Sequence, residues 1–334
     1  MTTVLYSERM YPDKAVEREV FGPDVRILTR GPRTLAELSD EDCAAADGLM
    51  LFRLWCSAAD LARFPNLRAI VRMGVGYDRI DRAAAAARGI LVCNVPDYGT
   101  REVADHAVTL ALVLRRGVLL QHEAQRRTPH APWQPIASPL VRRLDVQTFG
   151  ILGLGRIGTA AALRARAFGF RVVFFDPHRP NGTELALGLG RARSLEELLR
   201  QSDVLSLHTP LTSETRGLIG ARELALLPPG AVVVNTARGP VLDLDALAEA
   251  LRSGHLAGAG LDVLPVEPPV EPEPALLRAY RAREDWLEGR LVVTPHVAYH
   301  SPEAWDDIRR KSAETMAAAL LSNAPQNVIT PETP

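Results

Sequence analysis

The chain has 334 residues, of which 47% are hydrophobic, 24% are charged and 5% are aromatic. This length and composition indicate a globular protein of one or two domains and exclude a disordered, collagen-like or disulfide-scaffold chain. The 39 basic and 40 acidic residues give a formal net charge of −1, which argues against an extended nucleic-acid-binding surface.

Cysteine spacing and hydropathy favour an intracellular protein. Cys43, Cys56 and Cys93 are widely spaced and form no metal-binding pattern, so we expect buried thiols in a reducing compartment. No apolar run approaches the ~18 residues that a membrane-spanning helix needs. The first residues also lack the basic and apolar regions of a signal peptide. We therefore expect a cytoplasmic protein without membrane association.

Short apolar runs alternate with helical segments in the first third of the chain, a pattern typical of parallel sheets covered by helices. Strands are expected at residues 48–51, 67–71 and 90–93, and helices at residues 58–64 and 81–88. No complete nucleotide-binding fingerprint occurs among these elements. The pattern predicts a small α/β unit at the start of the chain.

A long connecting helix is predicted at residues 101–115, where Val103, Ala107 and Leu110 recur at helical spacing. Residues 125–141 carry four prolines and little periodicity. Because proline interrupts both helices and sheets, this segment is expected to be an irregular arm or linker.

From residue 148 the alternation of strands and helices restarts more strongly. The last helix is expected at residues 302–321, and residues 271–290 resemble an insertion. For this insertion, a helix over the cleft and a subunit contact are both open. The expected strands are residues 149–152, 171–175, 204–207, 231–235, 258–261 and 291–294.

A glycine motif opens this second part. Gly153, Gly155 and Gly158 follow an apolar run and precede an alanine-rich helix, an arrangement that brings a backbone turn and a helix N-terminus close to a pyrophosphate. Asp176 ends the next strand, 23 residues after Gly153, where its carboxylate would bind ribose hydroxyls and repel a 2′-phosphate. The motif predicts a dinucleotide site that prefers NAD to NADP, although the nearby Arg179 could accommodate a phosphate.

Polar residues follow three of the later strands. They occupy residues 235–239, 261–268 and 294–296, directly after expected strand ends. Because ligands bind beyond the carboxyl ends of parallel strands, we expect these segments to converge near the cofactor.

The motifs GLGRIG, NTARG, DVLPVEP and TPHVA together resemble the D-2-hydroxyacid dehydrogenase family, and residues 72–107 resemble its C-terminal-binding-protein-like branch. The resemblance extends from residue 67 to residue 316. It implies an α/β fold in which a Rossmann-type NAD-binding domain, residues 100–299, is inserted in a flavodoxin-like split substrate domain. Residues 1–99 and 300–334 would form that substrate domain.

The same resemblance implies that His296 is the catalytic acid/base, that Glu267 is its partner and that Arg238 binds substrate. The residue types suit these roles. Histidine titrates in the range needed to exchange a proton with a substrate hydroxyl, and a carboxylate partner favours the protonated imidazole. Arginine offers a fork for a substrate carboxylate. Taken singly, each has an ordinary alternative: a structural histidine, a surface arginine, a glutamate on a solvated loop.

Further contacts follow from the resemblance and from position. The turn Gly74, Val75 and Gly76 would offer backbone N–H groups to the substrate carboxylate, Tyr299 could contact the substrate side chain, and Asp262 would lie near the nicotinamide carboxamide. The other expected cofactor contacts are His106, Arg156, Ile157, His208, Thr209, Pro210, Thr236, Ala237 and Ala298, together with Arg238 and His296.

Some positions admit two interpretations. Edge packing or cofactor contact would explain His208, and His300 would line the pocket or face solvent. The remaining histidines have no ligand spacing, so no metal site is expected.

The favoured function is an NAD-dependent oxidoreductase that interconverts a small or medium D-2-hydroxy acid and its 2-oxo acid. The alternatives are an NAD(H)-sensing binding protein, like the corepressors of the resembled branch, and a phosphite-type dehydrogenase on the same fold. The complete Arg238, Glu267 and His296 set favours the enzyme. Specificity depends on pocket shape, so the sequence does not identify the acid. The resemblance also implies a homodimer, and residues 125–141 are a candidate interdomain or intersubunit element.

Overall fold

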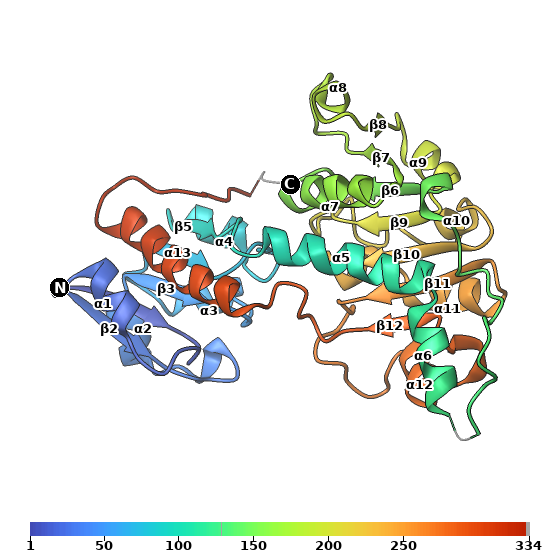
Figure 1. Ribbon diagram of the computed structural model, residues 1–334. Coiled ribbons are helices and arrows are strands. Elements are labelled where there is room, and N and C mark those ends of the chain that lie inside the picture. The colour runs from blue at the N-terminus through green and yellow to red at the C-terminus, as the bar shows by residue number, and fades with distance from the viewer. Residues whose placement is uncertain (128, 332–334) are drawn as a thin grey trace. The chain divides into compact units, whose positions relative to one another are not determined.

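The computed structural model describes residues 1–127 and 129–331. The chain divides into two compact units: unit 1 comprises Met1–Gly99 and His300–Pro334, and unit 2 comprises Thr100–Tyr299. Each unit contains a parallel sheet covered by helices (Figure 1). The expected α/β fold class is therefore confirmed.

Unit 1 is built around a five-stranded parallel sheet in the order β2-β1-β3-β4-β5. The strands and helices predicted between residues 48 and 93 are present, and each begins and ends within two residues of its predicted bounds. The strands at Thr2–Tyr6 and Val25–Thr29 were not predicted. The strands are β1 (Thr2–Tyr6), β2 (Val25–Thr29), β3 (Gly48–Leu51), β4 (Ala69–Arg72) and β5 (Leu91–Asn94). The helices are α1 (Ala15–Phe21), α2 (Asp40–Ala45), α3 (Ala58–Ala62), α4 (Arg82–Ala87) and α13 (Pro302–Leu320), with a 3₁₀ turn at Leu35–Glu37.

Helix α13 returns the end of the chain to unit 1. Its N-terminus is set by Ser301, whose hydroxyl accepts a hydrogen bond from the N–H of Ala304, and by Pro302 in the first turn. The buried side chains of Ile308 and Met316 lie on the face that packs against β3, β4 and β5. Unit 1 is therefore assembled from both ends of the chain.

Unit 2 contains a seven-stranded parallel sheet in the order β12-β11-β10-β9-β6-β7-β8. Strands β7 and β8 extend the sheet on one side of β6, and the strands from β9 onward extend it on the other side. In such sheets ligands bind beyond the carboxyl ends of the strands, where the order reverses. The strands are β6 (Thr148–Leu152), β7 (Arg171–Phe175), β8 (Gly190–Arg191), β9 (Val204–Leu207), β10 (Ala231–Asn235), β11 (Leu256–Leu261) and β12 (Leu291–Val293).

Helices cover both faces of the unit 2 sheet, and alternate residues of β10 show how. Val232 and Val234 pack with apolar residues of α5 and α7, whereas Val233 packs on the opposite face with α9, α10 and α11. The helices are α5 (Thr100–Arg115), α6 (Val118–Arg126), α7 (Arg156–Ala167), α8 (Thr183–Leu187), α9 (Leu195–Gln201), α10 (Ala221–Ala225), α11 (Leu244–Arg252) and α12 (Ala275–Arg281). 3₁₀ turns occupy Leu144–Val146, Gly239–Val241 and Asp285–Leu287.

Two segments with open interpretations have clear structures. The segment expected to be irregular begins inside α6, and the described residues after it form neither helix nor strand until the 3₁₀ turn at Leu144–Val146. The insertion-like stretch contains α12, whose Leu276 and Leu277 are buried and which packs against α11. This helix is therefore part of the core of unit 2.

The three cysteines are buried and unpaired, as predicted. Burial raises the pKa of the Cys56 thiol to about 12 and that of Cys93 to about 11, so both remain protonated at neutral pH. Within the described residues, no helix combines the length and apolarity needed to cross a membrane.

Candidate functional site

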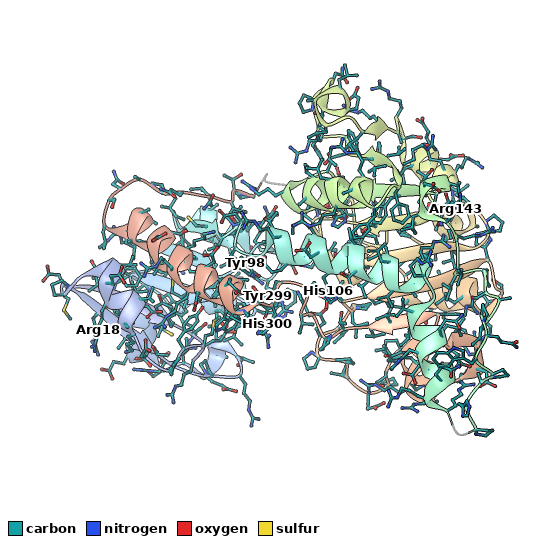
Figure 2. All side chains as sticks on the ribbon, in the orientation of Figure 1. Arg18, Tyr98, His106, Arg143, Tyr299 and His300 are labelled. Carbon is teal, nitrogen blue, oxygen red and sulfur yellow. The ribbon has the colours of Figure 1, made fainter. Side chains whose placement is uncertain are left out.

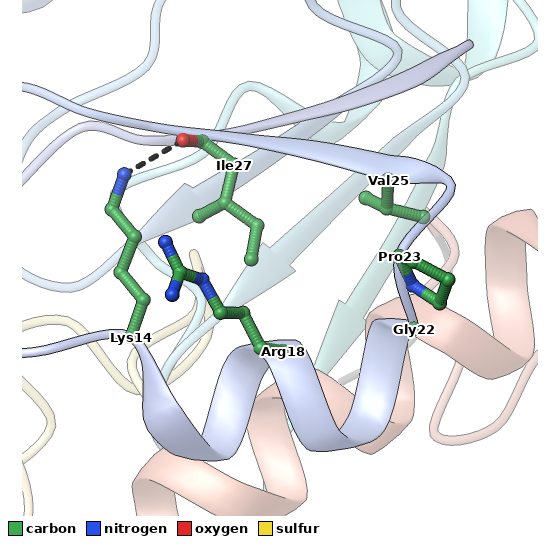
Figure 3. Close-up of a pocket in the computed structure, with 6 residues that line it drawn as sticks. All are labelled: Lys14, Arg18, Gly22, Pro23, Val25 and Ile27. Carbon is green, nitrogen blue, oxygen red and sulfur yellow. Dashed lines mark hydrogen bonds between the residues drawn. The ribbon is translucent and has the colours of Figure 1, made fainter.

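A cavity of about 420 Å³ lies between α1 and β2 in unit 1 (Figure 3). Lys14 and Arg18 line it, but the ammonium of Lys14 already donates a hydrogen bond of 2.8 Å to the carbonyl of Ile27. None of the predicted site residues lines this cavity. The candidate site is therefore built from the strand ends of unit 2.

The glycine turn connects β6 to α7 at the point where the strand order reverses. Gly153 has a φ of +91°, which favours glycine, and a Cβ at Gly158 would overlap the carbonyl oxygen of Gly153. Apart from atoms of Gly155 and its chain neighbours, the atom nearest to the position that a Cβ would take at Gly155 is a guanidinium nitrogen of Arg179, at 4.0 Å. The turn thus leaves open space in front of the first N–H groups of α7, which begins at Arg156.

Asp176 follows β7 and lies beside this turn. Its Oδ2 accepts a hydrogen bond of 2.8 Å from the N–H of Leu154, and its Oδ1 accepts one of 2.9 Å from the N–H of His178. Nε of Arg179 is 3.6 Å from Oδ2. Each carboxylate oxygen keeps a second lone pair, so Asp176 can accept further hydrogen bonds, including those of a diol.

Two buried hydroxyl groups lie at the ends of the neighbouring strands without hydrogen-bond partners. They belong to Thr209, after β9, and Thr236, after β10. Because an unpaired buried hydroxyl is unfavourable, both are suited to a polar group of a bound ligand. Together with the open glycine turn and Asp176, these hydroxyls fit a dinucleotide lying across the switch point.

His208 packs against the same turn. Its Nε2 is 2.9 Å from Oγ of Ser206, and a Cβ at Gly158 would lie 3.4 Å from the Cβ of His208. Burial lowers the pKa of His208 to about 4, so its imidazole is neutral near pH 7. The contact with the turn supports the packing interpretation of this residue.

Arg238 lies in a turn after β10 that Asn235 holds in place. The amide Nδ2 of Asn235 donates to the carbonyl of Arg238 at 3.0 Å, and its Oδ1 accepts from the N–H of Ala237 at 3.0 Å. A Cβ at Gly239 would overlap the backbone of Leu264. The Arg238 turn therefore packs directly on the loop that leads from β11 to Glu267.

His296 and Glu267 form a hydrogen-bonded pair. Nδ1 of His296 is 2.6 Å from Oε2 of Glu267, and Oε1 of the same carboxylate accepts a hydrogen bond of 2.8 Å from the N–H of Leu264. An ionised carboxylate only accepts hydrogen bonds, so Nδ1 carries the proton. Nε2 of the imidazole is then the nitrogen available for exchanging a proton with a bound molecule.

Asp262 is almost completely buried, with 1% of its side chain exposed, and it binds the segment that carries His296. Its Oδ1 accepts hydrogen bonds from the hydroxyl of Thr294 at 2.6 Å and the N–H of Val297 at 2.9 Å. Its Oδ2 accepts one from the N–H of Ala298 at 3.0 Å. His106 lies on α5 (Figure 2). Its Nε2 is 3.0 Å from Oγ1 of Thr294.

The other predicted residues fall in both units. The turn at Gly74 to Gly76 follows β4 in unit 1, where Nδ2 of Asn94 donates to the carbonyl of Val75 at 2.7 Å. Tyr299 ends unit 2, with its ring centroid 6.3 Å from that of His296. His300 is exposed, 6.4 Å from the ring of Trp305.

Unit 2 also contains the cofactor candidates Arg156, Ile157, Pro210, Ala237 and Ala298. Sequence reasoning did not single out Asn235 or Thr294 as functional. Asn235 lies in the motif NTARG and Thr294 in the motif TPHVA, each at the end of a strand. These positions could have identified them. Among the described residues no cluster of three or more His, Cys, Asp or Glu side chains could hold a metal ion.

Comparisons with known proteins point to one family. Residues 108–298 match the family model described as D-isomer specific 2-hydroxyacid dehydrogenase, NAD binding domain. The glyoxylate reductase of Korarchaeum cryptofilum is 38% identical over 295 residues, covering 87% of this chain and 84% of that protein.

Two solved structures are similar over nearly the whole chain. A glyoxylate reductase from Paecilomyes thermophila has a TM-score of 0.85 at 28% identity, covering 100% of this chain and 99% of the other. A D-lactate dehydrogenase from Aquifex aeolicus, complexed with NAD and lactic acid, has a TM-score of 0.80 at 28% identity, with 96% of each chain covered. The glycine turn, the strand-end residues and these matches lead to one conclusion: the chain belongs to the D-isomer specific 2-hydroxyacid dehydrogenase family of NAD(P)-dependent oxidoreductases.

Proposed function

We propose that this protein reduces a small 2-oxo acid, such as glyoxylate, to the corresponding D-2-hydroxy acid with NADH. The observation that carries the proposal is the 2.6 Å hydrogen bond between Nδ1 of His296 and Glu267, which leaves Nε2 as the proton-exchanging atom. The named activity of the Korarchaeum cryptofilum relative supports glyoxylate as the first substrate to test.

Each side chain of the site is assigned one role in the reduction. The glycine turn and Asp176 would hold NADH, which would supply the hydride for reduction of the carbonyl carbon. Nε2 of the protonated His296 donates a proton to the carbonyl oxygen, while Glu267 orients the imidazole and stabilises its charged form. The guanidinium of Arg238 binds the substrate carboxylate and stabilises negative charge that develops on the carbonyl oxygen.

The preference for NADH is assigned to Asp176. Its side chain is 12% exposed and two backbone N–H groups hold it in place beside the glycine turn. A 2′-phosphate there would meet a fixed negative charge. Arg179 offsets part of this repulsion, but the carboxylate is the more constrained of the two groups, since 40% of the arginine side chain is exposed.

The roles of the two units follow from this assignment. Unit 2 carries the glycine turn, Asp176 and the His296–Glu267 pair, so it is proposed as the NAD-binding domain. Unit 1 carries the turn at Gly74–Gly76, in which the N–H of Gly74 donates to the carbonyl of Arg72 at 2.8 Å. The N–H groups of Val75 and Gly76 are proposed to bind the substrate carboxylate, and unit 1 is proposed as the substrate domain.

The protein is further proposed to form a homodimer, with the segment at residues 125–141 as the candidate contact. Trp133 in this segment is 92% exposed, which is unusual for so large an apolar side chain. Symmetric dimers are the commonest soluble oligomers. Light scattering at micromolar concentration should report twice the mass of one chain, and a particle with the mass of one chain would contradict the proposal.

The activity is tested by offering a panel of 2-oxo acids with NADH and following loss of NADH absorbance. His296→Ala should lower turnover of the active substrate about 10²–10⁴-fold, the usual effect of losing a positioned acid–base group. His122→Ala, at an exposed histidine on α6, is the matched control and should retain wild-type turnover. Wild-type turnover in His296→Ala would refute the mechanism. NADH binding without reduction of any acid would favour a binding protein, and oxidation of phosphite would favour a phosphite-type dehydrogenase.

A further inference from the structure

A chain of hydrogen bonds connects helix α5 to the segment that carries His296. It runs from Nε2 of His106 to Oγ1 of Thr294 over 3.0 Å, and from Oγ1 of Thr294 to Oδ1 of Asp262 over 2.6 Å. A second, longer approach of 3.8 Å joins Nε2 of His106 to the same carboxylate oxygen. All three residues belong to unit 2.

The direction of these hydrogen bonds follows from donor and acceptor chemistry. The ionised carboxylate of Asp262 only accepts, so the single proton of the Thr294 hydroxyl points toward it. Oγ1 of Thr294 can then only accept from His106, which must carry its proton on Nε2. A side chain without an N–H donor at this position would leave Thr294 without its second hydrogen bond.

The segment held by this chain is under backbone strain. His296 has a φ of +53°, in the left-handed region that non-glycine residues rarely adopt. The N–H of His296 donates to the main-chain carbonyl of Asp262 at 2.8 Å, and the next two N–H groups donate to the Asp262 carboxylate. A strained conformation persists only where surrounding contacts determine it, and here they converge on Asp262.

Helix α5 is a rigid support for His106. One turn further along the helix, the Cβ of Leu110 lies only 3.0 Å from the position that a Cβ would take at Gly260 of β11. The glycine therefore lets α5 approach the strand that ends next to Asp262. Because side chains on packed helices and strands are held more accurately than those on loops, His106 can fix the Thr294 hydroxyl in space.

We propose that His106 and Thr294 are positioning residues that act through Asp262 to hold His296 in its reactive orientation. The inference rests on the proposed function, in which His296 is the acid/base. In this role His106 supports the segment that carries His296, which goes beyond the cofactor contact expected from the resemblance. A displacement of about 1 Å in a proton donor is enough to slow a reaction about 10²-fold, so these contacts matter although neither residue exchanges the proton.

The first test compares Thr294→Val, which has nearly the shape of threonine but no hydroxyl, with Thr294→Ser, which keeps the hydroxyl. Thr294→Val should lower kcat about 10–100-fold, as loss of supporting hydrogen bonds does in other sites, with little change in NADH dissociation constant. Thr294→Ser should retain most of the wild-type kcat. Thr109→Val, at an exposed threonine on α5, is the control and should behave as wild type.

A second pair tests the donor on α5. His106→Gln keeps an N–H group near the position of Nε2, whereas His106→Leu removes it. The glutamine variant should therefore retain more turnover than the leucine variant. This pair also carries the test if Thr294→Val fails to fold. Equal turnover in the two variants would overturn the assigned direction of the hydrogen bonds.

Hydrogen exchange of the cofactor-free protein provides a readout independent of activity. The amides of Val297 and Ala298, both bonded to Asp262, should exchange faster in Thr294→Val than in wild type. Unchanged kcat would overturn the proposal, and so would a lowered kcat with unchanged exchange at both amides, since that would assign Thr294 a direct role. A fall in NADH affinity matching the fall in turnover would also overturn it.

His296→Ala in the same assays separates this inference from the proposed function. If His296→Ala retains turnover, the proposed function fails. If it loses turnover while Thr294→Val and His106→Leu do not, only the positioning role fails.

Discussion

His208 should make unit 2 less stable in mild acid. Burial lowers the pKa of its imidazole from 6.5 to about 4. Between these values the unfolded chain binds more protons than the folded chain, so the free energy of unfolding decreases as the pH falls through this window. With about 1.4 kcal/mol per pKa unit, the full shift corresponds to about 3 kcal/mol, of which about 2 kcal/mol is lost between about pH 7 and pH 5.

The substitution His208→Gln tests this magnitude, because glutamine can still hydrogen-bond to Ser206 but does not titrate. Urea unfolding of the cofactor-free wild type and variant is measured near pH 7 and near pH 5. The difference between the two free energies of unfolding should move by about 2 kcal/mol in favour of the variant at the lower pH. His122→Gln, at an exposed histidine, should show no such change. A wild-type-minus-variant difference that is the same at both pH values would refute the reasoning.

Three further substitutions test the site. The wild-type kcat/KM with NADH should exceed that with NADPH by at least about tenfold, equivalent to about 1.4 kcal/mol, and Asp176→Ala should reduce this ratio. Equal kcat/KM values with the two cofactors in the wild type would contradict the role of Asp176. Glu267→Gln should lower kcat about 10–100-fold, because it replaces the carboxylate that lies 2.6 Å from Nδ1 of His296 and orients the imidazole. Wild-type kcat in Glu267→Gln would argue against the pair. Arg238→Ala should raise KM for the 2-oxo acid and lower kcat, with partial recovery in Arg238→Lys, since the guanidinium acts on both ground and transition states. Steady-state kinetics decides this, and an effect on neither constant would exclude Arg238 from the site.

Local sequence was sufficient for the elements whose patterns are short and continuous. The unit formed by β6, the glycine turn, α7 and β7 was predicted because an apolar run, three glycines and a terminal aspartate lie within one stretch. The strands β1 and β2 were missed, although both contain strand-favouring residues such as Val4 and Ile27. Their pairing with each other, and the pairing of β1 with β3, exist only in the folded sheet.

Residue types and short spacings were enough to predict the fold class, the glycine turn and the chemistry available at the strand ends. The connections among those residues depend on how distant segments pack in the folded chain. His106 and Thr294 are 188 residues apart in the chain, and Thr294 and Asp262 are 32 apart, yet their side chains form one chain of hydrogen bonds. No local pattern encodes such a contact, because it exists only once α5, β11 and β12 have packed together and buried the carboxylate of Asp262.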